Sequence, residues 1–143
     1  MLFRSSEAIA TYRKAIALNP GFAGAYNNLG YLFLQQKQYG DAESNLRRAV
    51  EIEPRFSTAV SNLGLLYAGT GRLDEAARYL NESLRLEPRS GETHARLAEV
   101  ALAKGDCAQA QFLARRALEL HPENERANRI RTSAEFARCP PIR

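Results

Sequence analysis

Two stretches of this 143-residue chain have nearly the same sequence: residues 25–33 read AYNNLGYLF and residues 59–67 read AVSNLGLLY. They lie 34 residues apart and share an Asn-Leu-Gly core. Self-similarity at a period of about 20–50 residues is typical of repeat proteins. The other positions of the chain should therefore recur with the same spacing.

Restricted residue types do recur at this period, in five columns. Prolines form one column, namely Pro20, Pro54, Pro88 and Pro122. Alanines form a second, namely Ala8, Ala42, Ala76 and Ala110. A third column holds Ala15, Ala49, Ser83 and Ala117. The last two are Leu29, Leu63 and Leu97, followed by Gly30, Gly64 and Ala98. Five columns in phase indicate a true internal repeat.

Each period contains two helical patterns and no strand alternation. In residues 23–36 the apolar side chains of Tyr26, Leu29 and Phe33 follow an i, i+3, i+7 spacing. A second pattern runs over residues 39–53, with apolar residues again on one face. One helical pair cannot bury its apolar face alone, so neighbouring pairs must stack. We predict an all-α fold built as a solenoid.

Glycine and proline mark the ends of these helices. The turn between the two patterns holds Gly71 in one repeat and Gly105 in the next, where glycine favours a left-handed helix end. The closing proline of each repeat cannot continue the second helix. The Gly or Ala at positions 30, 64 and 98 is expected to leave room for the backbone of the neighbouring helix.

The 34-residue period, the Leu-Gly pair, the aromatic residue four positions after the leucine, the mid-repeat alanine and the closing proline resemble the tetratricopeptide repeat family. The resemblance covers residues 5–124 and implies a right-handed superhelix of antiparallel helix pairs. The expected units are the second helix of a truncated repeat (5–19), three full repeats (23–56, 57–90 and 91–124), a capping helix (125–137) and a disordered tail (138–143). The last helix reads as a cap because Arg131 stands where the repeat has leucine, and a solenoid end needs a polar outer face.

The residues on either side of Leu29 have different expected roles. At about 100° per residue, Leu29 and Gly30 fall on the face that carries Tyr26, whereas Asn28 falls on the opposite side. The same reasoning places Asn62 outward. We therefore predict that the asparagines take no part in stacking.

The resemblance implies that this outward face lines a concave groove that binds a protein or peptide partner. The expected contact residues are Asn27, Asn28, Tyr31, Gln35, Asn62, Leu65, Arg96 and Glu99. Because a carboxamide both donates and accepts, Asn28 and Asn62 suit the main chain of an extended peptide. Such an asparagine ladder is similar to that of O-linked N-acetylglucosamine transferases. The alternative is that these asparagines bond only locally or to water.

A second family signal fails. The carboxylate clamp for chaperone tails needs Lys and Arg at fixed positions, but Asn27 stands where the first Lys belongs, and Glu92 and Glu99 flank Arg96. We therefore expect no strong anion clamp.

Neither a catalytic arrangement nor a cofactor or metal motif is visible, and His94 falls at a core-facing position. The predicted function is a non-catalytic interaction scaffold; the alternative is the substrate-recruiting part of a larger enzyme, such as an O-linked N-acetylglucosamine transferase-like glycosyltransferase.

Charge and terminal features give the remaining expectations. Residues 115–143 hold seven Arg and four Glu, but without interleaved exposed aromatics they favour a solvated helix face over a nucleic-acid site. The chain shows neither a signal peptide nor an apolar run that could span a membrane, which favours the cytoplasm. The truncated repeat leaves Phe3, Ile9, Tyr12 and Ile16 without a covering helix, so self-association through this end is expected. The spacing of Cys107 and Cys139 leaves a disulfide between them open.

Overall fold

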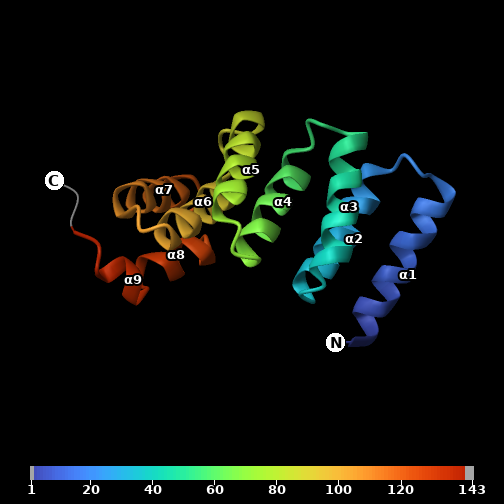
Figure 1. Ribbon diagram of the computed structural model, residues 1–143, viewed down its shortest axis with the longest axis horizontal. Helices are drawn as coiled ribbons and strands as arrows, with labels where there is room; N and C mark the ends of the chain where they lie inside the picture. Colours follow the sequence, from blue (N-terminus) through green and yellow to red (C-terminus); the bar gives the residue numbers. More distant parts are fainter. Residues whose placement is uncertain (1, 141–143) are drawn as a thin grey trace.

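The computed structural model describes residues 2–140, and over this range no residue lies in a strand. The helices are α1 (Leu2–Leu18), α2 (Ala23–Gln35), α3 (Tyr39–Ile52), α4 (Ser57–Gly69), α5 (Leu73–Leu86), α6 (Gly91–Ala103), α7 (Cys107–Leu120), α8 (Glu125–Arg131) and α9 (Ala134–Ala137). Figure 1 shows them side by side in one elongated row, with α1 at one end and α9 at the other. The predicted all-α solenoid is confirmed.

The helices form two layers. Each full repeat contributes a hairpin, α2 with α3, α4 with α5 and α6 with α7, and successive hairpins pack on one another. Contacts also join α2 to α4, α4 to α6 and α6 to α8, so these four helices form one continuous layer. We call them the inner helices; α1, α3, α5 and α7 are the outer helices. The apolar core runs between the two layers from α2 to α8.

The glycine column lets the two helices of a hairpin approach closely. A Cβ atom added to Gly30 would lie 2.7 Å from Leu46 Cγ and 3.1 Å from the Leu46 backbone nitrogen. At Gly64 the same atom would lie 2.6 Å from Leu80 Cγ. The prediction that these positions make room for a neighbouring helix is confirmed, and a fully buried leucine fills that room.

The turns within the repeats also follow the sequence. Gly71 and Gly105 have φ angles of 78° and 80°, as expected for glycine at a left-handed helix end. In the first full repeat Lys37 occupies the same place with φ 58°. A side chain at positive φ is disfavoured, so this turn is less favourable than the other two.

The N-terminal helix is better covered than expected. Ile9, Tyr12 and Ile16 of α1 are half-buried and pack against the apolar core through α2. The expectation that they lack a covering helix was wrong, because the next helix along the chain covers them. The side chain of Phe3 lies outside the described residues.

The C-terminal end differs from the single capping helix expected over 125–137. The helix stops at Arg131, and the Thr132 hydroxyl donates to the carbonyls of Asn128 and Arg129. Ser133 then accepts a hydrogen bond from the Phe136 backbone N–H and starts α9. Side-chain capping therefore divides the cap into two short helices. Within the tail expected to be disordered, Cys139 is bonded to Cys107, and residues 141–143 lie outside the described range.

Candidate functional site

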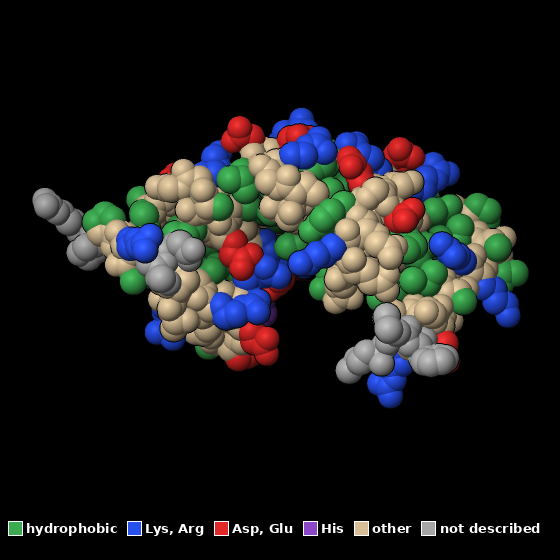
Figure 2. Space-filling model, turned by 60° about the horizontal axis from the view of Figure 1, so that its bottom comes forward, with side chains coloured by type: hydrophobic (Ala, Val, Ile, Leu, Met, Phe, Trp, Pro, Cys, Tyr) green, Lys and Arg blue, Asp and Glu red, His purple; other side chains and the backbone are tan. Residues whose placement is uncertain are grey.

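The candidate site is the surface of the inner helices. Figure 2 shows one face of the molecule, which is hollowed between its two ends and carries acidic and basic side chains beside the hollow. The inner-helix residues at equivalent positions of the repeat are 34 apart, so each column of the sequence becomes a row of neighbouring side chains. The chemistry of the groove follows from these rows.

A buried chain of hydrogen bonds links two neighbouring rows and joins three of the inner helices. Asn62 on α4 donates from Nδ2 to Oδ1 of Asn27 on α2, at 2.9 Å. Arg96 on α6 donates from Nη1 to Oδ1 of Asn62, also at 2.9 Å. The exposed fractions of Asn27, Asn62 and Arg96 are only 5%, 3% and 8%. We call these three residues the inner ladder.

Arg96 has further partners that fix its guanidinium group. Its Nη1 also donates to the Ser61 hydroxyl at 3.0 Å, and its Nε donates to Oε1 of Glu92 at 3.3 Å. Burial lowers the pKa of Arg96, and the neighbouring Glu92 carboxylate opposes that shift. An arginine stays protonated at neutral pH. The cation is therefore held inside the wall of the groove.

The capping helix α8 is attached to α6 by a second set of charged contacts. Arg126 donates from Nε to Oε1 of Glu92 at 2.9 Å and from Nη1 to Oε2 of Glu99. Asn124 donates to the other Glu92 oxygen at 3.1 Å. Burial opposes ionisation of Glu92, but the hydrogen bond and charge of Arg126 outweigh it and hold the pKa of Glu92 below its ordinary value. The charges at this end of the groove are thus paired with each other.

The accessible part of the groove lies toward α2. Asn28 and Gln35 are exposed, and Tyr31 and Leu65 are half-buried. Asn28 has one weak contact, in which its Oδ1 accepts from Asn27 Nδ2 at 3.4 Å. These side chains leave polar atoms and an aromatic ring available to a ligand.

The structure thus separates the expected contact residues into two groups. Asn27, Asn62 and Arg96 are joined in the inner ladder and buried, so the expectation that stacking makes no demand on Asn62 was wrong. The helical-wheel argument considered one helix alone, whereas adjacent inner helices pack side by side and cover this position. Glu99 is half-buried and bound to Arg126.

Two features of the groove were missed from the sequence. Ser61 bridges Arg96 and Thr93, with its oxygen 3.2 Å from the Thr93 hydroxyl. The second is Arg126, which the sequence pattern placed only within the capping helix. The repeat spacing could have predicted its contact with Glu92, because Arg126 lies 34 residues after Glu92 and therefore next to it in the row.

A second hollow opens between α6 and α8. Its volume is about 390 Å³, and it is lined by Glu99, Leu102, Ala103, Arg129, Ile130 and Ser133. Leu102 and Ile130 make its floor apolar, while Glu99 and Arg129 place opposite charges in its lining. This hollow shares Glu99 with the expected contact residues.

Other chemistry is sparse over the described range. The Nδ1 atom of the buried His94 lies 2.8 Å from the Ser90 carbonyl oxygen, consistent with a packed histidine. Residues 2–140 contain no group of three or more His, Cys, Asp or Glu side chains arranged to hold a metal ion. Within the same residues, no helix is both long and apolar enough to cross a membrane.

Comparisons with known proteins agree with this architecture. One family model, described as TPR repeat, matches residues 4–37, and two others, described as tetratricopeptide repeat, match residues 22–89 and 67–134. No curated protein sequence matches the chain.

Many solved structures are similar. A thermophilic TPR protein of Thermus thermophilus, TTC0263, superposes with a TM-score of 0.77 at 25% identity, over 89% of this chain and 71% of that one. MamA (41-end) from Desulfovibrio magneticus RS-1 gives 0.73 at 25% identity, over 87% and 70%. The first TPR of Spaghetti (RPAP3), bound to the HSP90 peptide SRMEEVD, gives 0.70 at 20% identity, over 74% and 84%. The similarity to this TPR domain of Spaghetti is a similarity of fold.

Proposed function

We propose, from the premise that this chain belongs to the tetratricopeptide repeat family, that it is a non-catalytic scaffold binding an extended segment of a protein partner in its groove. The observation that carries the proposal is the division of the inner surface. Buried polar groups fix the spacing of the inner helices, while Asn28, Tyr31, Gln35 and Leu65 stay accessible beside them. A rigid wall with accessible side chains suits binding rather than catalysis.

The neutral end of the groove favours main-chain recognition. The carboxamide of Asn28 can accept from a peptide N–H and donate to a peptide carbonyl. Tyr31 adds a half-buried ring on the next turn, against which a side chain of the ligand can pack. At the α6–α8 end of the groove, the charges of Glu92, Glu99 and Arg126 are already paired with each other, so this end should attract a charged ligand only weakly. We therefore expect the groove to select extended peptides with apolar side chains rather than strongly charged ones.

A linear-peptide display library tests this proposal and does not require the partner to be identified first. Peptides selected on the full chain should lose affinity for Asn28→Ala and Tyr31→Ala by about tenfold each, which corresponds to about 1.4 kcal/mol in titration calorimetry. Asn81→Ala is the matched control, because Asn81 is an exposed asparagine of the outer helix α5 whose Nδ2 donates to the Ala77 carbonyl. Equal affinities for all three variants, or no selected peptides, would refute groove binding.

Self-association at the N-terminal end stays a prediction. The exposed apolar residues at this end are Leu18 and Phe22 rather than Ile9, Tyr12 and Ile16. Leu18 at the end of α1 is 79% exposed and Phe22 in the following turn is 49% exposed. Sedimentation analysis at increasing concentration should show a dimer that Leu18→Ser with Phe22→Ser abolishes. A monomer at every concentration would contradict it.

A further inference from the structure

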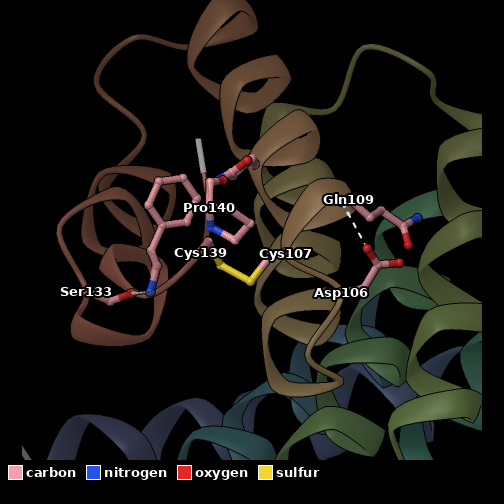
Figure 3. Close-up of a disulfide and its surroundings, with 8 residues drawn as sticks. Asp106, Cys107, Gln109, Ser133, Cys139 and Pro140 are labelled. Carbon is pink, nitrogen blue, oxygen red and sulfur yellow. Dashed lines mark hydrogen bonds between the residues drawn. A yellow bond between two sulfur atoms is a disulfide. The ribbon is translucent and has the colours of Figure 1, made fainter. Parts of the chain in front are cut away.

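A disulfide joins the C-terminal segment to the outer face of the solenoid. Cys107 is the first residue of α7, and Cys139 follows α9, 32 residues later in the chain. Figure 3 shows this bond crossing from the segment around Pro140 to the start of α7. One further hydrogen bond supports the attachment, from Gln111 Nε2 to the Pro140 carbonyl at 2.9 Å. We call residues 132–140 the strap.

Much of the strap is exposed. Thr132, Ala137, Arg138 and Pro140 are exposed, whereas Phe136 is half-buried against the core and Cys139 is buried. An open cavity of about 510 Å³ borders the strap at Phe136 and is otherwise lined by Arg131 and by Gln111, Ala114, Arg115, Leu118 and Glu119 of α7. The described contacts of the strap with the rest of the chain are therefore concentrated at Phe136, Cys139 and Pro140.

The preceding helix does not depend on the strap in the same way. Ala127 and Ile130 of α8 are buried against the repeats, and Arg126 pairs with two carboxylates of α6. The side chain of Asn124 caps the helix by accepting from the Ala127 backbone N–H at 2.8 Å. Loss of the disulfide should therefore leave α8 in place while releasing the strap.

We propose that the Cys107–Cys139 disulfide is a redox-operated clasp that closes the strap over α7. A thiolate of a dithiol reductant attacks one sulfur, and a mixed disulfide forms as the other cysteine leaves. The second thiol of the reductant then displaces the first cysteine. Two electrons and two protons pass to the protein, which gains two thiols, and the dithiol becomes a disulfide. Cys107 is half-buried and Cys139 is buried, so Cys107 is the less buried of the two cysteines.

Opening the clasp changes access to the end of the solenoid. With the strap closed, Phe136 lines the cavity together with Ala114 and Leu118 of α7. With the strap released, Phe136 leaves this cavity and its lining on α7 becomes more exposed. The inner ladder lies on the other layer of the molecule and is unaffected.

Hydrogen exchange followed by mass spectrometry on the full chain tests the clasp. After dithiothreitol, exchange in peptides covering 133–140 should rise on the order of tenfold or more, while peptides from α7 and α8 change less than about twofold. Cys107→Ser and Cys139→Ser should each show the released pattern without reductant and no further change with it. Gln111→Ala, which removes only the supporting hydrogen bond, should keep the closed pattern under oxidising conditions.

Three outcomes would overturn the proposal. Unchanged exchange in 133–140 after complete reduction, verified by thiol labelling, would show that noncovalent contacts hold the strap. A rise of similar size throughout α7 would make the bond a staple for the whole end of the solenoid. Loss of the closed pattern in Gln111→Ala alone would assign the closure to the hydrogen bond.

Discussion

Replacing Asn62 by alanine is expected to lower the free energy of unfolding by about 2.5–4 kcal/mol. The change removes a bond to the neutral Asn27, worth about 1 kcal/mol, and a bond from the charged Arg96, worth about 1.5–3 kcal/mol. Both partners are buried, so water replaces the lost bonds poorly. With a urea m-value of roughly 2 kcal/mol/M, the unfolding midpoint should fall by about 1–2 M.

Asn28→Ala is the matched control for this experiment. Asn28 is the adjacent asparagine on α2, exposed and joined only by one weak contact, so its loss should change stability by less than about 0.5 kcal/mol. Urea unfolding followed by circular dichroism at 222 nm measures both variants. If the two variants have equal midpoints, the inner ladder contributes nothing and the asparagines are interchangeable.

Three further predictions concern packing, pH and a turn. Gly64→Ala places a Cβ atom 2.6 Å from Leu80 Cγ and should cost about 1–3 kcal/mol in urea unfolding, whereas Gly40→Ala, with no atom within 4 Å, should be neutral or slightly stabilising. The lowered pKa of Glu92 means that its contribution is present above the unfolded-state pKa of about 4.3 and is lost as pH falls below it. Thermal unfolding of Glu92→Gln should therefore depend less on pH between about 5 and 3 than that of the native chain. Lys37→Gly relieves a positive φ and should raise the melting temperature; a decrease would show that the lysine side chain is needed.

The periodic features of this chain could be predicted because one packing rule repeats. Gly30 and Gly64 recur for the same reason, the buried leucine of the partner helix, and Gly71 and Gly105 recur because the turn needs a left-handed residue. A position that must meet the same packing or turn geometry in every repeat has the same residue type in these repeats. The all-α stack and its helix hairpins were therefore evident from sequence.

Features that involve two repeats at once were harder to predict. A wheel drawn for α4 alone places Asn62 outward, and only the adjacent inner helices reveal that the position is buried. The bond between Cys107 and Cys139 follows no repeat spacing, because it joins a repeat to a segment outside the pattern. The break at Ser133 depends on a local hydroxyl cap, which competes with helix continuation and leaves no periodic trace.

The inner ladder has a mechanical consequence for the whole superhelix. Its bonds of 2.9 Å connect α2, α4 and α6 in series, and a hydrogen bond weakens quickly when it is stretched. The inner layer therefore resists extension along the solenoid axis, whereas successive outer helices have few direct contacts with one another. When the solenoid bends, the distances along the inner ladder should therefore stay nearly constant. The distances between successive outer helices should change instead. The curvature presented to a partner can vary while the spacing of the groove-lining side chains stays constant.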